Sequence, residues 1–179
     1  SHMAFAINIT AGGESGAPIR ELWKQYRKFE AAPSMIDLGY PPHVTLAVYD
    51  VIAEQQLRDG MRTVFRTFPC IRLRFSRIAV FSEPRLVVWA APDACEPLFQ
   101  AHASVHRALG ASLCRKHYQP GRWVPHCNLA TNVGVDFVAD AKGMAACSIE
   151  PFEVIFTGAD CAEFYPIRVI DEVPLLGSG

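Results

Sequence analysis

The spacing of apolar positions along this chain alternates between two residues and three or four residues, which predicts alternating strands and helices. Residues 4–10 show the first spacing, with Phe5, Ile7 and Ile9 on one face of an expected half-buried strand. From Pro18 the spacing becomes that of an amphipathic helix, and proline is favoured at the first position of a helix. The same two spacings assign most of the remaining chain.

Strands are expected at residues 4–10, 43–49, 71–81, 85–91 and 126–131, and within residues 152–157, 160–164 and 167–173. Helices are expected at residues 18–29, 52–67, 95–109 and 136–147. Because strands that follow one another through short turns pair antiparallel, this order favours an α+β fold. We expect two pseudo-symmetric lobes whose antiparallel sheets line a central cleft, with helices packed outside.

A six-residue phrase occurs twice in the chain. The sequence PHVTLA at residues 42–47 returns as PHCNLA at residues 125–130. Each copy follows a helix and a loop that contains proline, and each precedes a helix and then strands. The repeat therefore indicates an internal duplication of supersecondary units, with one motif strand in each lobe.

Each copy of the phrase carries a histidine two residues before a short polar side chain. Because successive side chains of a strand point to opposite faces, His43 shares a face with Thr45, and His126 shares a face with Asn128. Two motif strands that face each other across the cleft would present two imidazoles and two hydrogen-bonding groups to one ligand. Histidine changes its protonation near neutral pH, so this set suits metal-free acid–base chemistry on a phosphate.

Composition and charge limit the alternatives. Half of the 179 residues are hydrophobic and the formal net charge is −1, which argues against electrostatic coating of long nucleic acids. No apolar run approaches the roughly 18 residues that span a bilayer, so we expect no membrane contact. We also expect the protein to be cytoplasmic and monomeric. Residues 1–3 resemble a cloning remnant and are left out, and residues 4–179 are expected to form a single domain.

The six cysteines include no C-x-x-C pair, which disfavours a zinc site and is typical of a reduced compartment. Cys127 lies between His126 and Asn128, but strand alternation turns its thiol toward the core and away from a nucleophilic role. His102 and His106 lie one helical turn apart, which is also a metal-ligand spacing. No carboxylate accompanies them, so we interpret them as solvated or partly packed and expect no metal or other cofactor.

The segment before the second motif, residues 111–125, is rich in aromatic and basic side chains. Tyr118 and Trp123 could stack on a base, and Lys116 and Arg122 could add positive charge near a phosphate. These four side chains are candidate substrate contacts.

The paired motifs resemble those of the two-histidine (2H) phosphoesterase superfamily, in the branch of 2′-5′ RNA ligases and RNA cyclic phosphodiesterases. The segment YQPGRWVPH at residues 118–126 is similar to the one that leads into the second motif of that branch. The resemblance implies a bilobal fold over nearly the whole chain and a metal-independent phosphoesterase that acts on phosphodiesters next to a ribose 2′-hydroxyl. RNA 3′ ends or small cyclic nucleotides would be its substrates.

By the same resemblance His43 and His126 are the catalytic residues, while Thr45 and Asn128 bind the phosphate. Asn128 departs from the family pattern, which has Thr or Ser at this position. An asparagine amide still donates to a phosphate oxygen. A non-catalytic module that binds RNA ends or nucleotides is the alternative that this departure and the weak net charge leave open.

Overall fold

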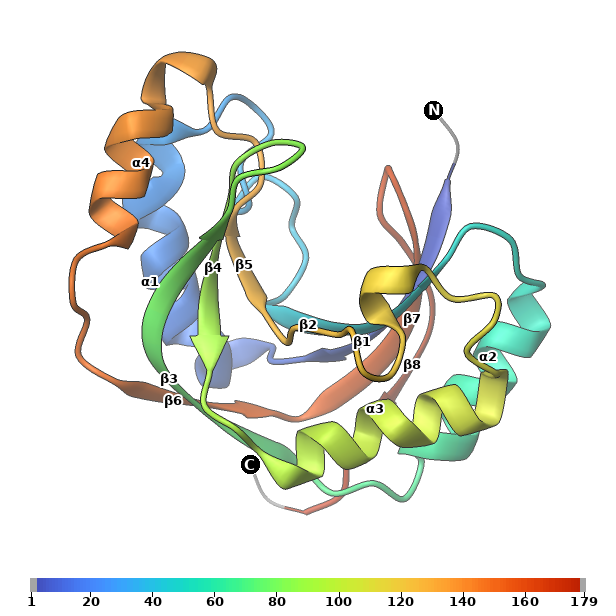
Figure 1. Ribbon diagram of the computed structural model, residues 1–179. Helices are drawn as coiled ribbons and strands as arrows, with labels where there is room; N and C mark the ends of the chain where they lie inside the picture. Colours follow the sequence, from blue (N-terminus) through green and yellow to red (C-terminus); the bar gives the residue numbers. More distant parts are fainter. Residues whose placement is uncertain (1–2, 178–179) are drawn as a thin grey trace.

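The computed structural model describes residues 3–177, which form two four-stranded antiparallel sheets that lean against each other (Figure 1). The first sheet has the order β2 (His43–Tyr49), β1 (Ala4–Thr10), β7 (Gly158–Phe164) and β8 (Arg168–Pro174). The second sheet has the order β5 (Cys127–Ala130), β4 (Val87–Pro92), β3 (Ile71–Phe81) and β6 (Phe152–Phe156). The expected α+β class with two antiparallel sheets is confirmed. Ser1 and His2, two of the three residues that resemble a cloning remnant, lie outside the described residues.

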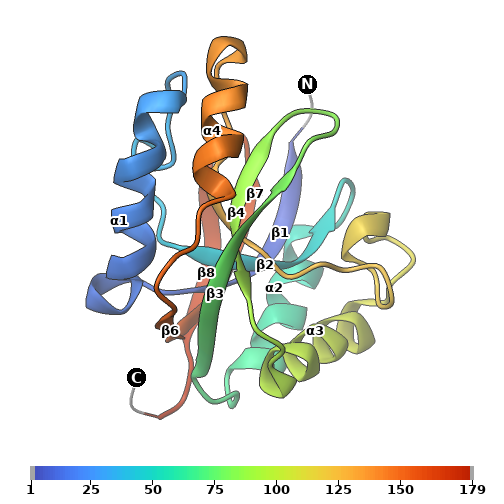
Figure 2. The ribbon, with the colours of Figure 1, turned by 60° about the vertical axis from the view of Figure 1, so that its left-hand side comes forward.

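Four α-helices cover the outer faces of the sheets (Figure 2). Helices α1 (Ala17–Tyr26) and α4 (Val138–Ala145) pack against the second sheet. Helices α2 (Glu54–Phe65) and α3 (Glu96–Leu109) pack against each other and against the first sheet. Short 3-10 turns lie at Gly13–Gly16, Arg27–Phe29, Lys116–Tyr118 and Val135–Phe137. No helix among the described residues is long and apolar enough to cross a membrane.

The two lobes do not correspond to the two halves of the sequence. Helix α1 lies between two strands of the first sheet in the sequence, yet it packs against the second sheet. The chain returns at its end to add β7 and β8 to the first sheet, where β7 pairs with β1. The repeated phrase therefore marks pseudo-symmetric strands within two interleaved lobes, and the crossings tie the lobes into one core.

The apolar faces meet in one large core. Trp23 and Tyr26 of α1 are buried in it, as their helical spacing indicates, and so is Cys127 of β5. The buried side of β1 is not limited to the predicted face of Phe5, Ile7 and Ile9. Its opposite face is also covered, and Asn8 is only 3% exposed.

The motif strands β2 and β5 are edge strands, and the two edges contact each other where the sheets meet. Both strands carry a β-bulge at the same motif position. In β2 the pairing with β1 skips Leu46, and in β5 the pairing with β4 skips Leu129. A bulge re-aims the side chains on either side of it. In β2 it leaves both Thr45 and Val48 on the side of the cleft.

Candidate active site

A cavity of about 120 Å³ lies beside the two motif strands. Its polar lining comes from β2, from β5, from β1 and from the loops that precede the motif strands: His43, Thr45, Asn128, Asn8, Tyr40 and Tyr118. Its apolar lining includes small and aromatic side chains of the first sheet, namely Ala6, Val48, Ala162 and Phe164. The motif face of each strand is partly accessible and the opposite face is buried, as the alternation predicts.

The two motif histidines are held in the same way. The Nδ1–H of His43 donates to the carbonyl oxygen of Pro41 at 2.9 Å, and the Nδ1–H of His126 donates to that of Val124 at 2.8 Å. A carbonyl oxygen only accepts, so each ring carries its hydrogen on Nδ1. Each neutral ring then keeps the lone pair of Nε2 for a proton transfer. The acceptor stands two residues before the histidine in both motifs, so the bond belongs to the repeat.

Burial favours the neutral form of both rings. Burial lowers the pKa of His43 to about 4, and a positive charge on His126 would lower it further. Burial also lowers the pKa of His126. The two imidazoles are therefore coupled electrostatically through the effect of His126 on His43. A bound phosphate would reverse these shifts, because an anion stabilises the protonated imidazole.

Aromatic rings contact both histidines. The Tyr40 ring meets His43 edge-on at 4.8 Å between centroids. The ring of His126 lies edge-on to Phe81 at 5.3 Å and to Trp89 at 5.7 Å, and it is 6.3 Å from Tyr118. These contacts limit rotation of the imidazoles and reduce their hydration.

Side-chain donors bind backbone carbonyl groups of both edge strands. The indole N–H of Trp123 donates to the Thr45 carbonyl oxygen at 3.1 Å. The indole N–H of Trp23 donates to the carbonyl oxygen of Asn128, the equivalent residue of the second motif, at 2.9 Å. A third donor, His106 Nε2, lies 3.3 Å from the carbonyl oxygen of the bulged residue Leu46. These bonds fix the backbone that carries the site and occupy edges that would otherwise be open.

His102 and His106, which we expected to be solvated or partly packed, are buried, with 5% of each exposed. They pack inward because the loop before β5 crosses over α3. His102 stacks on Trp123 at 4.0 Å with the rings nearly parallel, and its Nε2 lies 2.7 Å from the Tyr118 carbonyl oxygen. Burial lowers the pKa of both histidines, that of His102 to about 4. Their contacts fix the loop before β5 and the backbone of β2, on the side of these segments away from the cavity.

A buried network of hydrogen-bonded side chains extends from Thr45 into the first sheet, and the sequence pattern did not reveal it. The Thr45 hydroxyl donates to Asn8 Oδ1 at 2.6 Å. The Asn8 amide nitrogen donates to the Tyr40 hydroxyl at 3.1 Å and to Asp160 Oδ1 at 3.0 Å, and the Tyr40 hydroxyl donates to Asp160 Oδ2. The signal in the sequence was Asn8 in the middle of one strand and Asp160 in the middle of another, each with apolar residues on both sides.

Asn128 occupies the position equivalent to Thr45 with different partners. Its Oδ1 is buried without a hydrogen-bond partner in the part of the chain that the structure describes. The amide nitrogen is therefore the group that this side chain can offer to the cavity that it lines. A donor at this position is the property that a phosphate oxygen requires.

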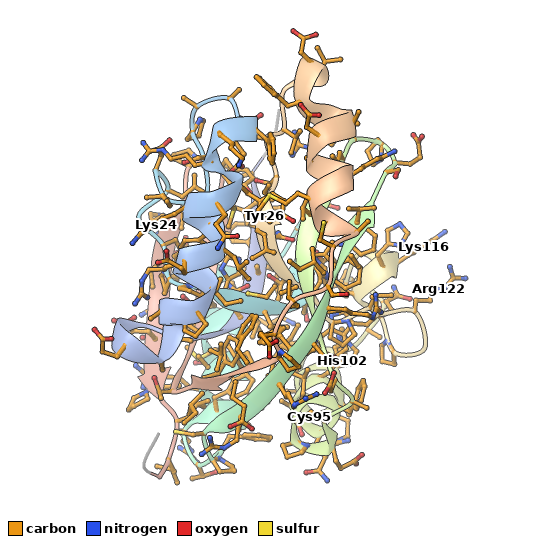
Figure 3. All side chains as sticks on the ribbon, turned by 90° about the vertical axis from the view of Figure 1, so that its left-hand side faces the viewer. Lys24, Tyr26, Cys95, His102, Lys116 and Arg122 are labelled. Carbon is orange, nitrogen blue, oxygen red and sulfur yellow. The ribbon has the colours of Figure 1, made fainter. Side chains whose placement is uncertain are left out.

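The four candidate substrate contacts of residues 111–125 differ in placement. Tyr118 lines the cavity. Trp123 is packed between His102 and Phe99 and bonded to the β2 backbone, which gives it a structural position. Lys116 and Arg122 are exposed and point away from the body of the molecule (Figure 3).

Comparison with known proteins shows the family to which the chain belongs. The sequence matches the 2′-5′ RNA ligase superfamily over residues 15–165, so the chain belongs to this family of phosphoesterases and RNA ligase-like enzymes, as the resemblance indicated. A search of curated proteins finds no significant match.

Solved structures share the fold. A protein described as a phosphoesterase matches with a TM-score of 0.65 and 17% identity, over 99% of this chain and 100% of the other. TT0787 of Thermus thermophilus matches with a TM-score of 0.62 and 18% identity, over 98% and 100%. E. coli LigT in complex with 3′-AMP matches with a TM-score of 0.62 and 15% identity, over 99% and 100%. At such low sequence identity, these structural matches show a common fold and no more.

Proposed function

We propose that this protein is a metal-independent phosphodiesterase that opens 2′,3′-cyclic phosphates, or reversibly forms phosphodiesters next to a ribose 2′-hydroxyl, with His43 and His126 as its acid–base pair. The observation that carries the proposal is that both imidazole rings are held by the same hydrogen bond to the backbone. Each imidazole has its Nδ1–H bonded to the carbonyl two residues earlier and its Nε2 left for chemistry. The family and the 3′-AMP complex of E. coli LigT support a ribonucleotide substrate.

Opening a cyclic phosphate needs one proton removed from water and one delivered to the leaving ribose oxygen. Attack and departure lie on opposite sides of phosphorus, so two groups on two facing edges fit the reaction. A neutral imidazole accepts the proton of water through Nε2, while the other imidazole, protonated in the field of the bound phosphate, donates through Nε2. Each general acid–base step contributes roughly 10²–10⁴-fold. The two roles exchange when the reaction runs backward.

Thr45 and Asn128 contact the non-bridging oxygens, where negative charge grows during attack. The apolar side of the cavity then receives the nucleoside. Tyr118 and Phe164 flank a floor of the small side chains Ala4, Ala6 and Val48, which suits a flat ring. Because that floor bears no base-specific donor or acceptor side chain, we expect little preference among the four bases.

The test is hydrolysis of a panel of 2′,3′-cyclic nucleotides and of 2′-5′ and 3′-5′ dinucleotides with and without EDTA, with products identified by phosphorus NMR. We expect turnover that survives EDTA and a bell-shaped pH profile. His43→Ala and His126→Ala should each reduce turnover by at least about 10²-fold. His117→Ala, which removes an exposed imidazole that does not line the cavity, is the matched control and should keep its turnover.

The alternative, a non-catalytic module that binds RNA ends or nucleotides, makes the opposite prediction. Both histidine variants would still bind a terminal phosphate, and no variant would turn it over. Turnover that EDTA abolishes would also contradict the proposal.

A further inference from the structure

The hydrogen bonds around Thr45 leave its hydroxyl turned away from the cavity. Asn8 Oδ1 accepts a hydrogen from Thr45 at 2.6 Å, and Asn8 is 3% exposed, so no water competes for this bond. Thr45 then faces the cavity with lone pairs. An anionic phosphate oxygen is also an acceptor, so the observed arrangement opposes the contact that the proposed function requires of Thr45.

Asp160 determines which end of the Asn8 amide faces Thr45. As a carboxylate, Asp160 only accepts, and it takes a hydrogen from the Asn8 amide nitrogen and another from the Tyr40 hydroxyl. The amide nitrogen is thereby held toward Asp160, and the amide oxygen is left for Thr45. With an ionised Asp160, every side-chain hydrogen of this group has an acceptor within the group.

Protonation of Asp160 permits a second arrangement. The new carboxyl O–H needs an acceptor, and the Asn8 oxygen provides one when the amide turns over. The amide nitrogen then donates to Thr45 Oγ1, and the Thr45 hydrogen is free to point into the cavity. The proton comes from solvent, and no covalent bond other than O–H is made.

We propose that Asp160, acting through Asn8 and Tyr40, is a positioning residue that decides whether Thr45 presents a hydrogen or a lone pair to the ligand. This inference rests on the proposed function of Thr45 as a phosphate contact. It follows that binding of an anion at Thr45 takes up a proton at Asp160.

The register of the first sheet supports this coupling. Thr45 pairs with Asn8, Asn8 pairs with Asp160, and Asp160 pairs with Glu172, so one polar row crosses all four strands. Glu172 is exposed at the outer edge. It is the charged group that faces Asp160 from β8, Tyr40 faces it from the loop before β2, and His43 lies beyond the Tyr40 ring. Burial, with a smaller contribution from Glu172, raises the pKa of Asp160 to about 6.

The test uses inorganic sulfate, whose charge is constant over the relevant pH range, and measures its affinity by calorimetry at about pH 8. Asp160→Asn imitates the protonated carboxyl, because its amide nitrogen donates where the carboxylate accepts. We expect Asp160→Asn to bind sulfate at least about tenfold more tightly than the parent protein, the factor of one hydrogen bond to an anion. Thr45→Val should abolish this gain when the two substitutions are combined.

Two further variants keep the inference testable if Asp160→Asn does not fold. Tyr40→Phe removes a donor to the carboxylate, so Asp160 should protonate at higher pH and sulfate affinity at about pH 7 should rise. Glu172→Gln removes a charge from the same row at its exposed end and should change affinity less than twofold. Calorimetry in two buffers should show that Thr45→Val takes up fewer protons on binding than the parent protein.

Equal affinity of Asp160→Asn and the parent protein would overturn the inference, and so would a gain that persists without the Thr45 hydroxyl. Absence of sulfate binding to every variant would overturn it together with the proposed phosphate site. Coupled sulfate binding without hydrolysis of any cyclic phosphate would contradict only the proposed function.

Discussion

Replacement of His102 by glutamine should make the protein less sensitive to acid. The imidazole is buried, stacks on Trp123 and has its Nε2 2.7 Å from the Tyr118 carbonyl oxygen. Burial lowers its pKa to about 4, below the value of about 6.5 expected in the unfolded chain. The unfolded state therefore binds a proton first as the pH falls. His102 therefore lowers the free energy of unfolding progressively as the pH falls from about 6.5 to about 4. Outside this window its contribution to the free energy of unfolding changes little with pH.

The magnitude follows from the two pKa values. Between about pH 7.5 and about pH 5, a group with these values reduces the free energy of unfolding by about 2 kcal/mol. His102→Gln keeps an N–H donor for Tyr118 and does not titrate. Asp160 changes stability with the opposite sign, because its raised pKa favours the folded state at low pH and that contribution is lost as the pH rises through about 6. The comparison of variant and parent cancels this contribution and that of the other groups that do not contact His102.

The assay is urea unfolding followed by tryptophan fluorescence at the two pH values, for the parent protein and for His102→Gln. The parent should lose about 2 kcal/mol more than the variant on acidification. An identical pH dependence of the two proteins would refute the argument, because it would mean that His102 is hydrated and titrates normally in the folded state.

Three further predictions concern the support and the chemistry of the site. Trp123→Phe removes the N–H donor to the Thr45 carbonyl and should lower the free energy of unfolding by about 1 kcal/mol, measured by urea unfolding, with a loss of turnover; unchanged values for both would contradict the bracing role. Cys127→Ala should leave turnover within about threefold, since burial raises the pKa of this thiol to about 12 and no thiolate forms; loss of activity with the fold retained would argue for a nucleophilic thiol. Asn128→Leu should reduce turnover by about 10²-fold while Asn128→Thr retains most of it, and equal rates for the two would exclude donation by this side chain.

The repeated phrase was sufficient to predict that polar side chains of both motif strands lie beside one cavity. His43, Thr45 and Asn128 line one cavity, and His126 is close enough to affect the pKa of His43, because strand alternation and duplication are local properties that the sequence displays. The predicted strands at residues 4–10, 43–49 and 71–81 have the same bounds in the structure, and the other predicted elements differ by a few residues at their ends.

The interleaving of the lobes and the buried network of hydrogen-bonded side chains could not be predicted in the same way. Asn8, Tyr40 and Asp160 come from distant parts of the chain, and their proximity depends on β7 returning to pair with β1. The inward packing of His102 likewise depends on the path of the loop that carries Trp123 over α3. Long-range pairing of this kind leaves no periodic signal in the residues themselves.

The most direct test of the central claim is a long-range proton–nitrogen NMR spectrum of the imidazoles of His43 and His126, recorded with and without inorganic phosphate. We predict that both free rings are neutral with the hydrogen on Nδ1, and that phosphate shifts the Nε2 resonances of both rings together. An Nε2–H tautomer in either free ring, or a response of only one ring, would contradict a phosphate held between two equivalent imidazoles.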